Sequence, residues 1–132
     1  MKEASYYERL EGGAVKCHLC PQECLIREGR RGFCRVRSNH DGVLYADNYE
    51  RVLACNLDPV EKKPLFHFHP GRPILSLGTR GCNQRCDFCQ NWEMLETESP
   101  GTHITSDEIA GMAGRRGSVG VAYTYNEPMV WF

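Results

Sequence analysis

The sequence predicts an α/β chain in which a small β-rich metal module precedes the first β-α-β unit of a (β/α) barrel. Two observations predict this order. The N-terminal part combines four cysteines with short apolar runs around turn signals, which is typical of a small metal-stabilised β module. After Pro73 an apolar strand, a helix with a capping signal and a second strand follow one another. That succession favours parallel strand pairing with a right-handed crossover.

We expect three segments along the chain. Residues 1–57 form the four-cysteine module, residues 58–72 a connector, and residues 73–132 the first β-α-β part of the barrel. A full or three-quarter barrel needs roughly 200 residues or more. If the β-α-β unit belongs to such a barrel, the 132-residue chain is an N-terminal fragment or truncated product, and we interpret it so. Alone, it is expected to expose a sheet edge and to be prone to aggregation or inactive.

Charge and hydropathy narrow the class of protein. The formal net charge of -1 speaks against nucleic acid as the main partner. No apolar run is long enough to cross a bilayer, and the first residues lack the apolar core of a signal peptide. We therefore predict a cytoplasmic protein with no membrane partner. Eight cysteines in that compartment indicate metal binding rather than disulfides, which are the weaker alternative.

Four of the cysteines predict a first metal site. Cys17, Cys20, Cys24 and Cys34 follow the spacing C-x2-C-x3-C-x9-C, which can enclose one tetrahedral ion and would stabilise a stretch with few apolar residues. Zinc is the preferred occupant, and a second iron-sulfur cluster is the alternative that the thiols alone leave open. His18 is interpreted as a bystander.

Local patterns predict the remaining N-terminal elements. Tyr6, Tyr7 and Leu10 at helical spacing before a Gly-Gly pair predict a short helix. Asp41-Gly42 between apolar runs predicts a β-hairpin. Cys55 is interpreted as a small buried hydrophobic residue.

Two further stretches are expected to face solvent. The arginine-rich run from Arg27 to Arg37 is interpreted as a solvated face. The proline-punctuated stretch from Asn56 to Arg72 predicts a loop, in which the charges of 61–63 are interpreted as solvated. His67 and His69 are interpreted as surface or packing residues rather than ligands.

The β-α-β unit is defined by three signals. Ile74 to Leu77 predicts a buried strand, Thr105-x-x-Glu108 a capping box at a helix start, and Val119 to Tyr125 a second strand. Parallel strands end at the same edge of a sheet. We therefore expect Asn126-Glu127-Pro128, after the second strand, to lie beside the loop that follows the first.

That loop carries a second set of thiols. Cys82, Cys86 and Cys89 follow the spacing C-x3-C-x2-C, which matches neither a closed zinc site nor the common ferredoxin patterns. Three thiolates on a four-iron cluster would leave one iron open for another ligand. Zinc or a loop of free thiols is the weaker interpretation.

The loop resembles a known family. With Phe88 before its last cysteine, it is similar to the motif of radical S-adenosylmethionine (radical SAM) enzymes. A closer resemblance is to the AmmeMemoRadiSam-system enzymes, relatives of the pyruvate formate-lyase activating enzymes, and it runs from about Tyr7 to the last residue. The strings that carry it are Gly81-Cys82-Asn83, Cys89-Gln90-Asn91, Glu61-Lys62-Lys63-Pro64 and Tyr123-Thr124-Tyr125-Asn126-Glu127-Pro128.

The resemblance implies a radical SAM barrel and its cofactors. Cys82, Cys86 and Cys89 would bind a [4Fe-4S] cluster whose open iron holds S-adenosylmethionine, and reductive cleavage would give a 5′-deoxyadenosyl radical. Phe88 would lie against the adenine. Tyr125, Asn126 and Glu127 match the segment that meets the methionine amino group, which is Gly-Gly-Glu in the familiar motif.

The resemblance assigns no catalytic side chain. Its expected partners are an electron donor, such as a reduced flavodoxin or ferredoxin, and a substrate that the sequence does not identify, with a protein as one candidate. Two other functions stay open: an iron-sulfur electron-transfer protein, and a zinc-stabilised binding module that uses the basic residues Arg30 and Arg31.

Overall fold

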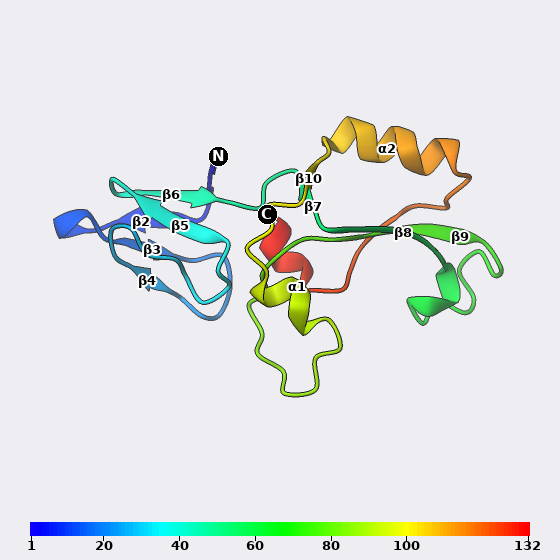
Figure 1. The fold of residues 1–132 in the computed structure, drawn as a ribbon, viewed down its shortest axis with the longest axis horizontal. Coiled ribbons are helices and arrows are strands. Elements are labelled where there is room, and N and C mark those ends of the chain that lie inside the picture. Colours follow the sequence, from blue (N-terminus) through cyan, green and yellow to red (C-terminus); the bar gives the residue numbers. More distant parts are fainter.

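The computed structural model describes all residues, 1–132. It shows two parts at opposite ends of the molecule, with short elements between them (Figure 1). A small β module forms one end, and a three-stranded sheet covered by a helix forms the other. The short helix α1 (Trp92–Glu96) and the C-terminal turn η3 (Pro128–Trp131) lie between them. None of the helices has the length and apolar character that a membrane span requires.

The N-terminal module consists of two small antiparallel sheets. One has the order β1-β6-β5 and the other β2-β3-β4. Val15, Cys17, Ile26 and Leu44 form the core of the module. The strands are β1 (Lys2–Glu3), β2 (Tyr7–Arg9), β3 (Val15–Cys17), β4 (Leu25–Ile26), β5 (Arg37–His40) and β6 (Val43–Ala46).

The predicted hairpin is confirmed. Strands β5 and β6 pair antiparallel with His40 opposite Val43, so Asp41 and Gly42 form a two-residue turn. Both turn residues have positive φ, 53° and 73°. A type I′ turn requires this conformation, and an Asp-Gly pair adopts it readily.

The predicted N-terminal helix is wrong. Tyr7–Arg9 is strand β2, which pairs with β3 so that Tyr7 lies opposite Cys17. Only the turn η1 (Glu11–Gly13) has helical character there. An isolated helix of so few residues is marginal in water. Strand β3 offers this segment a backbone partner, which its own spacing of apolar residues could not reveal.

The second part contains the predicted β-α-β unit. Strands β9 (Pro73–Gly78) and β11 (Val121–Tyr123) pair in parallel, and α2 (Ser106–Arg115) connects them and covers one face of the sheet (Figure 1). The predicted capping box is present, since the Glu108 backbone N–H donates to Thr105 Oγ1 at 3.3 Å and the Thr105 N–H to the Glu108 carboxylate at 2.8 Å. The hydrophobic core of this part consists of Val52, Leu75, Leu77, Ile109 and Ala113.

The predicted connector is shorter than expected. Strand β8 (Ala54–Pro59) reaches into it and pairs antiparallel with β9, with Asp58 opposite Ile74. The two prolines of the pairing, Pro59 and Pro73, stand at strand ends, where a missing N–H is tolerated. Only the turn η2 (Val60–Lys62) and the residues up to Arg72 remain as connector. Strands β7 (Arg51–Val52) and β10 (Thr102–His103) form a separate antiparallel pair.

Candidate functional site

The three-cysteine loop begins at the carboxyl end of β9 and hangs below α1 in Figure 1. Cys82 is buried at its start, Cys86 is exposed and Cys89 is half-buried. Gly81 has φ +77°, and a Cβ there would lie 2.4 Å from the Cys34 carbonyl oxygen. Only glycine allows the loop to start in such close contact with the N-terminal module.

The segment after β11 lies against this loop, as predicted from the parallel topology. The Glu127 backbone N–H donates to Cys82 Sγ at 3.5 Å. Asn126 Nδ2 donates to the Gly81 carbonyl at 2.7 Å. From the far side of the loop, Asn91 Nδ2 donates to the Tyr125 carbonyl at 2.9 Å. Both ends of the cysteine loop are thus tied to the residues that follow the second parallel strand.

The three thiols are not arranged as a ready ligand set. No group of three or more His, Cys, Asp or Glu side chains in the structure is placed to hold a metal ion. Cys86 and Cys89 line one pocket of about 210 Å³ together with Trp92, and the Cys89 N–H donates to the Cys86 carbonyl at 3.1 Å. Cys82 does not line that pocket. The structure therefore brings two of the predicted ligands together and leaves the third at the base of the loop.

The surroundings of Cys82 nevertheless fit a bound polar group. Asn83 Oδ1, Asn126 Oδ1 and Thr79 Oγ1 are buried and have no hydrogen-bond partner. Native proteins rarely leave such atoms unsatisfied, because each costs about 1–3 kcal/mol. Asn83 follows Cys82 in the chain and Asn126 donates to the Gly81 carbonyl, so these unpaired atoms lie near Cys82 and not near the other two thiols. A soft thiol with such polar neighbours suits an iron-sulfur cluster that takes a further polar ligand.

The residues predicted to contact the cofactor differ in their exposure and in their contacts. Phe88 is 90% exposed and packs in no core cluster. The Glu127 side chain is exposed, and its backbone rather than its carboxylate touches the loop. Tyr125 is half-buried and has φ +71°, a conformation that costs a non-glycine residue about 1–3 kcal/mol. Such strain persists only where surrounding contacts hold the residue in place.

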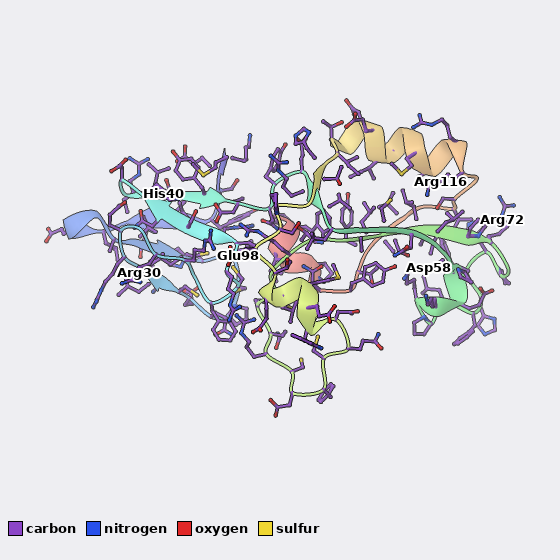
Figure 2. The ribbon with its side chains drawn as sticks, in the orientation of Figure 1. Arg30, His40, Asp58, Arg72, Glu98 and Arg116 are labelled. Carbon is purple, nitrogen blue, oxygen red and sulfur yellow. The ribbon has the colours of Figure 1, made fainter.

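Asp58 holds that tyrosine, and sequence reasoning missed it. The Tyr125 hydroxyl donates to Asp58 Oδ2 at 2.9 Å and accepts from Asn56 Nδ2 at 3.1 Å. Lys62 and Lys63 donate to the same carboxylate at 3.1 and 2.9 Å. Figure 2 labels Asp58 on β8 beside the η2 turn.

The charges around Asp58 favour its ionised form. Burial alone raises the pKa of this carboxyl, but the hydrogen bonds from Lys63, Lys62 and Tyr125 outweigh burial and hold the pKa well below its usual range. The expected solvated charge run at 61–63 is therefore wrong for Lys63, whose side chain is 14% exposed. The spacing of Asp58 and Lys62, four residues apart, was the one local signal of this contact.

The four N-terminal cysteines meet around a single small cavity. Cys17, Cys20, Cys24 and Cys34 all line a space of about 20 Å³. Burial raises the pKa of the Cys17 and Cys34 thiols. As expected for a bystander, His18 turns to carboxylates instead, with Nδ1 2.8 Å from Glu23.

Two other expectations for single residues have clear outcomes. Arg37, expected on a solvated face, is 2% exposed and lines the four-cysteine cavity. Burial lowers the pKa of its guanidinium, and the nearby Cys34 and Cys17 thiols oppose that shift. Cys55 packs against the core of the second part with its Sγ 3.6 Å from Met112 Sδ, as expected for a small hydrophobic residue.

Comparison with known proteins gives three partial similarities. No family model matches the chain, and no solved structure matches it. The whole chain is 47% identical over 135 residues to uncharacterized protein MJ0808 of Methanocaldococcus jannaschii, of which it covers 40%. Uncharacterized protein MJ0674 of the same organism is 31% identical over 82 residues, 61% of this chain and 19% of that protein.

The third similarity is to a protein with a named activity. The 7-carboxy-7-deazaguanine synthase of Bacteroides thetaiotaomicron is 33% identical over 64 residues, which are 48% of this chain and 32% of that enzyme. The chain thus spans well under half the length of each of these curated relatives, and its whole-length similarity is to the first of them.

Proposed function

We propose that this chain forms the cofactor-binding part of a radical SAM enzyme. One observation carries the proposal: the three-cysteine loop follows the first of two parallel strands, and the segment after the second strand donates a backbone hydrogen bond to Cys82 Sγ. Part of the chain is also similar to 7-carboxy-7-deazaguanine synthase, a radical SAM enzyme.

In this proposal Cys82, Cys86 and Cys89 would hold a [4Fe-4S] cluster and leave one of its irons free for S-adenosylmethionine. The chemistry that this pair supplies when bound is one-electron cleavage of a sulfonium, which yields a carbon radical able to abstract hydrogen. The Glu127 N–H would stabilise charge on the Cys82 sulfur and so raise the cluster's reduction potential. Asn126, tied to Gly81, positions that N–H.

The face of the sheet opposite α2 supports the barrel architecture. Asn56 lies opposite Ser76 and Asp58 opposite Ile74, so these side chains share one face of β8 and β9. Leu75 and Leu77 alternate with these residues along the strand, so their side chains point to the other face and pack under α2. Helices on the outer face of the sheet, and a site at the carboxyl ends of the parallel strands, are features of a β/α barrel. We propose that this sheet begins a partial radical SAM barrel behind the N-terminal module.

The finer proposal concerns the type of enzyme. The sequence around Cys82, Lys62 and Tyr125 resembles that of AmmeMemoRadiSam-system enzymes. We therefore propose a reaction like that of the activating enzymes, with a protein as one candidate substrate. The proposed electron donor is a reduced flavodoxin or ferredoxin. Arg85, whose guanidinium donates to the Phe33 carbonyl at 2.8 Å, anchors the outer part of the loop to the N-terminal module.

The proposal is tested by cluster assembly and by turnover. After anaerobic reconstitution of the full-length protein, iron and sulfide per chain are measured, and 5′-deoxyadenosine release is followed with S-adenosylmethionine and a strong reductant. We expect a cluster, and we expect Cys86→Ala to abolish both the cluster and the release. Cys55→Ala is the matched control, because that partly buried thiol packs against the core of the second part.

A second readout separates the proposed function from electron transfer alone. Addition of S-adenosylmethionine to the reduced protein is expected to change the electron paramagnetic resonance spectrum of the cluster, since the open iron gains a ligand. A cluster whose spectrum ignores the cofactor would support an electron-transfer protein instead. Release of 5′-deoxyadenosine that survives Cys86→Ala would exclude the assignment of the loop.

A further inference from the structure

The N-terminal module contains a second arrangement of thiols, separate from the proposed cluster. The Cys17 N–H donates to the Cys24 carbonyl at 2.9 Å, and the Glu23 N–H to the Cys20 carbonyl at 3.1 Å, so a tight loop after β3 gathers three of the cysteines. The Phe33 N–H donates to Cys24 Sγ at 3.4 Å and brings the neighbouring Cys34 to the same place. Backbone contacts therefore bring the four cysteines to one cavity, although their thiols do not yet form a ligand set.

The size of the space between the thiols favours a single ion. The cavity that all four line has a volume of about 20 Å³. One water molecule needs roughly 10–15 Å³ on this measure. A cluster of four irons and four sulfides would not fit without displacing the lining residues. Four thiolates around one ion are the ligand set of structural zinc, which is tetrahedral and needs no open position.

Arg37 supplies an independent argument for a negatively charged occupant. Arg37 lines the cavity and is 2% exposed, and its guanidinium donates to Asn48 Oδ1 at 3.0 Å, to the Val130 carbonyl at 3.4 Å and to the Phe132 carbonyl oxygen. The nearby carboxylate of Asp47 pairs with Arg31 and Arg80 instead, whose nitrogens lie 3.5 and 3.8 Å from its Oδ2. A buried charge without a counter-charge is costly. One zinc ion with four thiolates has a net charge of -2 and would compensate it.

We propose that Cys17, Cys20, Cys24 and Cys34 bind one zinc ion that holds the N-terminal module together and against the three-cysteine loop. The four thiols already line one cavity, and binding of the ion would bring them into its coordination shell, because metal binding and folding are coupled. The link to the loop is direct: Gln22, between two of the ligands, donates from Nε2 to the Asn83 carbonyl at 3.2 Å, and Asn83 also lines the cavity. This proposal stands independently of the proposed function.

The test measures metal content rather than activity. Protein prepared without added iron is analysed for zinc and iron by mass spectrometry, with about one zinc per chain expected. X-ray absorption at the zinc edge is expected to show four sulfur neighbours at about 2.3 Å. A shell with fewer sulfurs, or iron and sulfide in place of zinc, would overturn the proposal.

Variants assign the ion to these thiols. Removing the three loop thiols together, by changing Cys82, Cys86 and Cys89 to Ala, is expected to leave the zinc in place, and Cys55→Ser is a second control. Cys20→Ser is expected to lower zinc content severalfold and to lower the midpoint of thermal unfolding. If that variant does not fold, cobalt titration of the refolded wild type replaces it, and absence of a tetrahedral thiolate spectrum would contradict the proposal. Zinc lost with the loop thiols would contradict it as well.

Discussion

Lys62 and Lys63 both contact the Asp58 carboxylate, but only Lys63 does so with a largely buried side chain. Their Nζ atoms lie 3.1 and 2.9 Å from it, while the two lysine side chains are 64% and 14% exposed. We predict that Lys63→Met lowers the free energy of unfolding by about 2 kcal/mol, within the range of hydrogen bonds to charged groups. Lys62→Met, the matched control, should cost less than about 1 kcal/mol, as exposed ion pairs do.

The magnitude follows from what remains around Asp58 in each variant. After Lys63→Met the carboxylate keeps Lys62 and the Tyr125 hydroxyl, so the loss stays below the 3–5 kcal/mol typical of a fully broken buried pair. Lys63 also lies 5.1 Å above the Tyr125 ring, a contact worth roughly 0.5–1 kcal/mol. In urea unfolding, about 2 kcal/mol moves the midpoint by about 1 M at a slope of about 2 kcal/mol/M.

The decisive comparison is a double-mutant cycle. In an Asp58→Asn background the cost of Lys63→Met should shrink markedly, because the neutral amide no longer needs the ammonium. Equal costs of the two lysine substitutions in the wild-type background, or an unchanged Lys63 cost in the Asn background, would refute the reasoning.

The same carboxylate predicts a pH dependence with a definite sign. Because the pKa of Asp58 is lowered in the folded protein, its stabilising contribution is fully present above the unfolded-state value of about 3.9. That contribution is lost as pH falls further, toward the folded-state pKa. The stability difference between wild type and Lys63→Met should therefore narrow below about pH 4, and a difference that widens there would count against the assignment.

Three further predictions concern single positions and are measured by urea unfolding. Gly81→Ala should cost about 2–4 kcal/mol, since it combines positive φ with a contact at 2.4 Å to the Cys34 carbonyl oxygen, and a neutral effect would mean that the loop does not pack this way. Thr105→Ala should cost about 1 kcal/mol through loss of the helix cap, and Thr105→Ser should restore most of it. Tyr125→Phe should cost about 1 kcal/mol, and a stabilised Phe variant would show that the hydroxyl does not bind Asp58.

The candidate site was partly predictable because part of it follows from local order in the chain. The strand, loop and helix around Cys82 put that cysteine at a sheet edge, and parallel pairing then placed Asn126 and Glu127 beside it. Asp58 escaped prediction because its partner Tyr125 lies 67 positions away. In addition, Asp58 lies in strand β8, and the sequence predicted a proline-punctuated loop there.

By itself, the sequence determined those features whose energies arise within a few neighbouring residues. The capping box of Thr105 and the turn at Asp41-Gly42 are of this kind, and so is the spacing of the cysteines. Tertiary structure alone decided that Tyr7–Arg9 is a strand and that Arg37 is buried beside four thiols. The physical reason is that a backbone partner for Tyr7–Arg9, or hydrogen-bond acceptors for Arg37 such as the Val130 carbonyl, come from distant segments and outweigh weak local preference. Their positions are known only when the chain has folded.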